Sequence, residues 1–100
     1  MRLSPEQIRL IVACVRQQFG ADAGVKLFGS RLDDGVRGGD VDLLVECASL
    51  PTLMQRARAT MALEAALNLP VDIVATQRGT PGSAFARIAR SRAQSLEVPA

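Results

Sequence analysis

Acidic side chains stand at the start of two apolar runs that have the composition of β-strands. Asp40 and Asp42 lie on either side of Val41 in the segment GGDVDLLVE, and Asp72 is the second residue of VDIVA. Because side chains alternate between the two faces of a strand, Asp40 and Asp42 are expected to point the same way, about 7 Å apart. Two carboxylates at that separation suit one divalent cation, and Mg²⁺ prefers such oxygen ligands.

A segment suited to binding anions, Gly29-Ser30-Arg31, directly follows the apolar run 25–28. Glycine lets the backbone approach a ligand closely, and successive amide N–H groups form anion-binding concavities. Ser30 adds a hydroxyl donor and Arg31 adds a cation. A site that binds phosphates beside one or two Mg²⁺ ions held by carboxylates is typical of phosphoryl or nucleotidyl transfer.

The apolar spacing predicts an order of elements that would position these residues. Ser4-Pro5 with Gln7 is a helix start, and apolar residues of the second helix include Leu53, Met54, Ala57, Met61, Leu63 and Leu67. The expected helices cover residues 5–19, 51–68 and 84–94, the expected strands cover 25–28, 41–45 and 71–75, and residues 98–100 are expected to fray.

The connection between the second and third strands decides whether the three aspartates meet. A helical connection favours a parallel, right-handed crossover, so both strands start at the same edge of the sheet. Asp72 is then expected beside Asp40 and Asp42, and an antiparallel first strand would bring Gly29 to the same edge. We predict an α+β fold, a small mixed β-sheet with helices packed on it, as a single domain over residues 1–100.

The composition excludes several kinds of chemistry. The chain has no histidine, which removes His-based acid–base catalysis and the usual zinc sites, and it has neither Trp nor Tyr to stack on a base. Cys14 and Cys47 lack metal-ligand spacing and are predicted to be reduced, buried hydrophobes. With no apolar run of about 18 residues and a net charge of only +2, we expect a cytoplasmic protein with neither a membrane span nor a nucleic-acid partner.

Three segments in this order, LFGSR, GGDVDLLVE and PVDIVA, resemble the minimal nucleotidyltransferases of the DNA polymerase β superfamily. That family has Gly-Ser after an apolar residue, Asp-x-Asp about ten residues later, and a further Asp on a later strand. The resemblance covers most of the chain. Two features depart from the family pattern: Gly39 stands where many members have Ser, and the loop from Gly29 to Gly35 is one residue longer than the common form.

The resemblance implies a role for each matching residue. Gly29 and Ser30 would bind ATP or another nucleoside triphosphate, with help from Arg31. The metals would be bound by Asp40 and Asp42. Asp72 would complete the metal site and help to deprotonate the attacking hydroxyl. The remaining charged residues are expected to have solvated or structural roles, with Glu46 placed deeper on the same strand face; the others are Asp33, Asp34, Arg37, Arg87 and Arg90.

Three functions are compatible with this pattern. Members of this size resemble antitoxins paired with a helical, ribonuclease-type HEPN toxin, which implies transfer of AMP from ATP to a hydroxyl of that protein partner. The alternative is a catalytically silent binding module that neutralises its partner sterically. A third hypothesis, modification of a drug, would need a second domain in trans because a chain of this length has no room for one. In each case the protein could form either a homo-oligomer or a hetero-oligomer.

Overall fold

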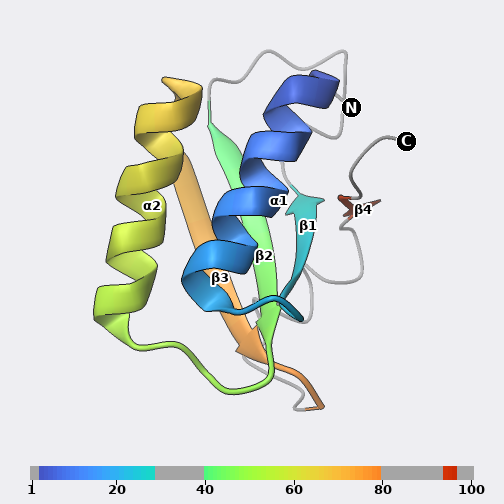
Figure 1. The fold of residues 1–100 in the computed structure, drawn as a ribbon, viewed down its shortest axis with the longest axis vertical. Coiled ribbons are helices and arrows are strands. Elements are labelled where there is room, and N and C mark those ends of the chain that lie inside the picture. The colour runs from blue at the N-terminus through green and yellow to red at the C-terminus, as the bar shows by residue number, and fades with distance from the viewer. Residues whose placement is uncertain (1–2, 29–39, 80–93, 97–100) are drawn as a thin grey trace.

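The computed structural model describes residues 3–28, 40–79 and 94–96, and these residues form two helices and one four-stranded sheet. The helices cover the same face of the sheet (Figure 1). The predicted α+β fold with a small mixed sheet is therefore confirmed. In chain order the elements are α1 (Pro5–Phe19), β1 (Gly24–Phe28), β2 (Val41–Cys47), α2 (Leu53–Leu67), β3 (Val71–Gln77) and β4 (Gln94–Ser95).

Both helices begin with a capping box that the sequence specifies locally. The Ser4 hydroxyl accepts the backbone N–H of Gln7, whose side chain accepts the backbone N–H of Ser4. Thr52 and Gln55 make the same reciprocal pair, so α2 begins at Leu53 rather than at the predicted Pro51. Such caps satisfy backbone N–H groups that have no partner within the helix.

The sheet order is β3-β2-β1-β4, with β2 at its centre between a parallel and an antiparallel neighbour. The β2–β3 pair, which α2 connects, is parallel, as predicted, and the β1–β2 pair is antiparallel. One prediction was wrong at its boundary: Gln94 was expected to end a helix, but it begins β4, which pairs antiparallel with β1. The rest of that predicted helix and the predicted frayed end lie outside the described residues.

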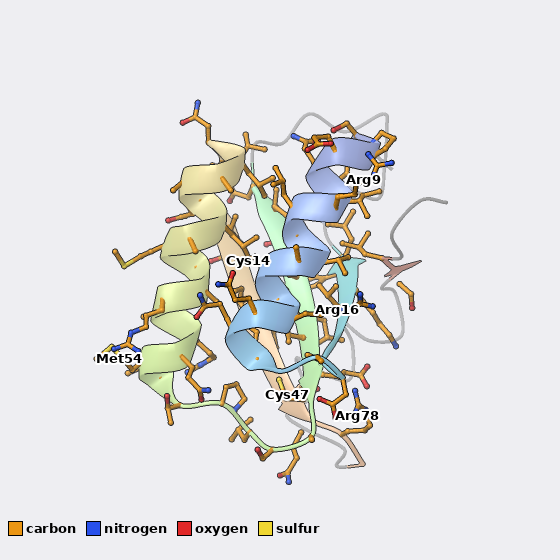
Figure 2. All side chains as sticks on the ribbon, viewed as in Figure 1. Arg9, Cys14, Arg16, Cys47, Met54 and Arg78 are labelled. Carbon is orange, nitrogen blue, oxygen red and sulfur yellow. The ribbon has the colours of Figure 1, made fainter. Side chains whose placement is uncertain are left out.

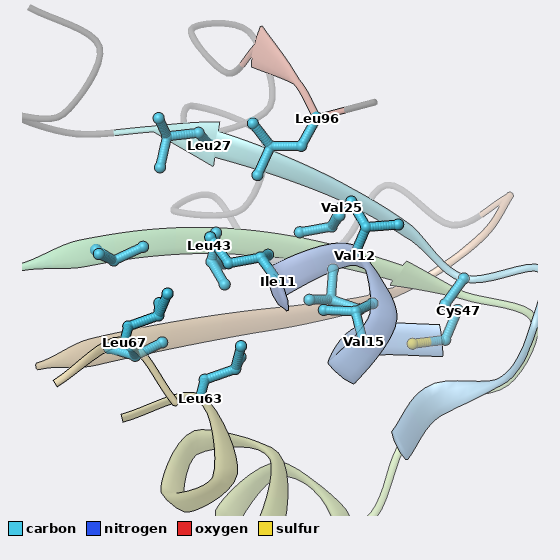
Figure 3. Packing of buried hydrophobic residues seen from close by; sticks show 14 residues of the cluster. Ile11, Val12, Val15, Val25, Leu27, Leu43, Cys47, Leu63, Leu67 and Leu96 are labelled. Carbon is cyan, nitrogen blue, oxygen red and sulfur yellow. The ribbon is translucent and has the colours of Figure 1, made fainter. Parts of the chain in front are cut away.

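The core lies between the sheet and the two helices (Figure 3). Strand β2 is buried on both of its faces, because Leu43 belongs to this core and Leu44, which points the other way, is also 0% exposed. Both cysteines are free thiols, with Cys47 buried and Cys14 half-buried, and burial raises the pKa of each thiol. Of the two described helices, neither combines the length and apolar character that crossing a bilayer requires.

Candidate active site

The strand register brings two of the predicted aspartates directly together. In the parallel β2–β3 pair, Asp42 lies opposite Asp72 and Val41 lies opposite Val71. Asp40 immediately precedes β2 at the same edge. Asp40 and Asp72 are exposed and Asp42 is half-buried, so the three carboxylates lie where solvent and ligands have access.

The electrostatics show that these carboxylates act on one another. Burial raises the pKa of the Asp42 carboxyl, and the negative charges of Asp72 and then Asp40 raise that pKa further. Within residues 3–28, 40–79 and 94–96, no group donates a hydrogen bond to any of the three carboxylates. The edge of the sheet therefore concentrates negative charge that the described residues leave uncompensated, which favours binding of a cation.

Two hydrogen bonds hold together the strand starts that carry the aspartates. The Val71 N–H donates to Glu64 Oε2 at 3.0 Å, and the Val41 N–H donates to the Pro70 carbonyl at 2.9 Å. Glu64 on α2 thus fixes the residue next to Asp72, and Pro70 fixes the residue between Asp40 and Asp42. This role of Glu64 is not predictable from the sequence, because no pattern in the sequence links a helical glutamate to a particular N–H of the next strand.

The predicted phosphate-binding segment, Gly29-Ser30-Arg31, lies outside the described residues, so its role stays a prediction. Its position in the chain is nevertheless defined, because Phe28, the last residue of β1, lies opposite Asp42. The described part of β1 therefore ends at Phe28, opposite Asp42. Asp33, Asp34, Arg37, Gly39, Arg87 and Arg90 also lie outside the described residues.

Glu46 lies on the same face of β2 as Asp42, four residues further along, which corresponds to roughly 13 Å. Its Oε1 atom lies 3.2 Å from Lys26 Nζ on the neighbouring strand β1. Both side chains are largely buried, at 22% and 31% exposure respectively. Glu46 is therefore placed in a structural ion pair and not among the aspartates, in line with the structural role expected for it.

The arrangement suits a metal that arrives with a ligand rather than one held by the protein alone. Across the described part of the chain, no three His, Cys, Asp or Glu side chains are grouped closely enough to form a metal site by themselves. Mg²⁺ is usually bound through one or two carboxylates together with water and substrate phosphates. The pair Asp42 and Asp72, with Asp40 beside them, fits that mode of binding.

The raised pKa of Asp42 gives a testable pH dependence of stability. A carboxyl whose pKa is raised by folding stabilises the fold below its ordinary value of 3.8, and this stabilisation is lost as the pH rises through the folded-state pKa. At neutral pH without divalent cations, Asp42→Asn is therefore expected to unfold at a higher temperature than the native protein. The advantage should vanish in acid, when Asp42 is protonated.

Thermal unfolding in EDTA at neutral and acidic pH measures this difference. Asp22→Asn serves as the matched control, because Asp22 lies 3.6 Å from Arg78 and its charge is favourable rather than repelled. A neutral-pH melting temperature of Asp42→Asn at or below that of the native protein would show that the charge of Asp42 does not destabilise the fold.

Comparison with known proteins places the fold in a defined class. Neither a protein-family model nor a curated protein matches this sequence. Solved structures do match: one protein assigned to the minimal nucleotidyltransferases shares 28% identity with a TM-score of 0.62, over 92% of this chain and 95% of that one. The fold is that of the minimal nucleotidyltransferases.

Two further neighbours come from toxin–antitoxin complexes. One is from the Shewanella oneidensis complex of a tri-AMPylated HEPN toxin with an MNT antitoxin, at 20% identity and a TM-score of 0.72 over 94% of this chain and 71% of that one. The other is from a toxin–antitoxin complex with AMP-PNP, at 21% identity and a TM-score of 0.76 over 97% of this chain and 75% of that one. At these identities the similarity shows a shared fold.

Proposed function

We propose that this chain is a Mg²⁺-dependent nucleotidyltransferase that acts as an antitoxin, transferring AMP from ATP to a hydroxyl of a HEPN-type toxin. The observation that carries the proposal is the pairing of Asp42 with Asp72 in the sheet register, with Asp40 at the same edge. The structural neighbours from toxin–antitoxin complexes, one with an AMPylated toxin and one with AMP-PNP, support the choice of nucleotide and partner.

Each candidate site residue has its own task in the proposed reaction. Asp40 and Asp42 would hold the cation, Asp72 would complete its site, and Gly29, Ser30 and Arg31 would bind the triphosphate. Bound Mg²⁺ would neutralise charge on the phosphates and make the α-phosphorus more electrophilic. Asp72, exposed and opposite Asp42, accepts the proton of the attacking hydroxyl. The hydroxyl oxygen then forms a bond to the α-phosphorus, while the bond between the α-phosphorus and the leaving pyrophosphate breaks.

Positioning accounts for much of the expected rate. Holding the hydroxyl, the α-phosphate and the base in one geometry replaces an encounter of separate molecules. The hydrogen bonds from Val71 to Glu64 and from Val41 to Pro70 fix the backbone next to the aspartates, so their spacing is set before a ligand binds. The mutually repelling carboxylates are then already in position, so binding of the cation needs little rearrangement of the strands.

Intact mass spectrometry tests the proposal. The purified chain, its copurified protein partner, ATP and Mg²⁺ are incubated together, and the partner is expected to gain the mass of one or more AMP groups. EDTA and an ATP analogue whose α–β bridge cannot be cleaved serve as controls. An unmodified partner despite Mg²⁺-dependent ATP binding would shift the function to the alternative, a binding module that neutralises its partner sterically. Absence of nucleotide binding would exclude the transferase.

A further inference from the structure

Helix α2 has a second apolar face that packs against nothing in the described fold. Ala59, Leu63 and Leu67 are its buried residues and contact the sheet side of the molecule. Leu53, Met54 and Met61 are 74%, 60% and 70% exposed. Large apolar side chains this exposed, gathered on one helix, are typical of a protein interaction site.

Four exposed residues of α2 form a continuous line, here called the α2 stripe: Met54, Ala57, Met61 and Ala65. At 100° per residue they fall within an arc of about 80° on the side opposite the buried residues. Met54 projects from α2 away from α1 and the sheet (Figure 2). The small alanines leave space next to the flexible methionines. Side chains of another helix can pack into such spaces.

The charge next to the stripe is positive. Arg58 is exposed and lies beside the stripe, four residues and about one helical turn after Met54. The sole acidic residue of α2 is Glu64, whose carboxylate is engaged by the Val71 N–H at 3.0 Å. Helix α2 therefore offers no free carboxylate to pair with Arg58.

This charge distribution argues against a second copy of the chain packed antiparallel on the stripe. In an antiparallel pair of identical helices each flank meets the same flank of its copy, so Arg58 would meet a surface that contains Arg58 and no acid. Like charges that face each other across an interface weaken binding. The occupant that the stripe and Arg58 fit is a foreign helix with an apolar face and an acidic side chain beside it.

We infer that the α2 stripe is the docking surface for an amphipathic, acidic helix of the protein partner. The inference rests on the proposed function in that the partner is the protein to be modified. Ala65 lies two residues before the end of α2, and three residues then lead to β3, where Asp72 is located. A helix seated on the stripe would hold its protein next to the aspartates, so docking and transfer use adjoining surfaces.

Binding of synthetic helical peptides to the full chain, measured by fluorescence anisotropy without nucleotide, tests the inference. One peptide has a leucine face flanked by Glu, and the other has the same face flanked by Lys. We expect the Glu peptide to bind at least about tenfold more tightly, because charge complementarity sets partner choice. Met61→Glu should weaken that binding at least about tenfold, and Arg58→Glu should reverse the preference.

Ala13→Glu, which adds the same charge at an exposed position on α1, is the matched control and should bind the Glu peptide like the native chain. Circular dichroism verifies the fold of each variant. Equal binding of the two peptides, no binding of either, or a dimer of the native chain that Met61→Glu dissociates would overturn the inference. Because no nucleotide is present, this result is independent of the transferase proposal, whose own test is Mg²⁺-dependent ATP binding by the same Met61→Glu variant.

Discussion

Replacing Asp42 by Asn is expected to reduce nucleotidyl transfer by about 10³-fold or more, with the fold intact. The carboxylate lies opposite Asp72 and beside Asp40, so its loss removes a metal ligand from the centre of the site. Asn keeps the shape and an oxygen ligand but removes the charge that compensates the cation. The rate of AMP incorporation into the partner at saturating ATP and Mg²⁺ measures the effect.

The same substitution at Asp22 is the control for this experiment. Asp22 is exposed, and its contacts with Arg78 lie away from the strand starts that carry the other aspartates. Asp22→Asn should retain most of the native rate. Transfer by Asp42→Asn within tenfold of the native rate would remove Asp42 from the catalytic site, whatever the stability of the variant.

Leu43→Ala is expected to lower the free energy of unfolding by about 2–5 kcal/mol, the usual cost of such a core truncation. Leu43 follows Asp42 in β2, an inner strand of the sheet, and is a 0% exposed member of the hydrophobic core. A domain of this kind is stable by about 5–15 kcal/mol in total, so the variant would lose a large share of its stability. Urea unfolding followed by circular dichroism measures the loss.

Leu50→Ala gives the matched comparison, since Leu50 is 64% exposed and the same atoms are removed. Its effect should stay within about 0.5 kcal/mol, as is usual for surface changes. Similar losses for Leu43→Ala and Leu50→Ala would mean that β2 is not the buried centre of the sheet.

The parts of the fold that the sequence predicts are those with local signals. The capping residues Ser4 and Gln7 specify the start of α1, and the helix between β2 and β3 specifies the parallel pairing that sets Asp42 opposite Asp72. The two-residue strand β4 was missed because so short a segment has no periodicity, and its pairing with Lys26 and Leu27 is a tertiary contact.

Helix α2 shows another limit of periodicity. The apolar residues Leu53, Met54 and Met61 predict a helix correctly, but they do not say which of two apolar faces packs on the sheet. The structure shows that Ala59, Leu63 and Leu67 are the buried residues of α2, which packs against α1 and β3. The contact of Glu64 with Val71 likewise depends on how the helix and strand meet in space.

Binding of Mn²⁺, a paramagnetic substitute for Mg²⁺, with a non-hydrolysable ATP analogue is the most direct measurement of whether Asp40, Asp42 and Asp72 share one cation. Electron paramagnetic resonance counts the free Mn²⁺ in each titration. The native chain is expected to bind Mn²⁺ more tightly when the analogue is present, and Asp42→Asn and Asp72→Asn should each weaken this binding by at least about tenfold. Equal Mn²⁺ binding by the native chain and both variants would contradict a shared metal site at this edge of the sheet.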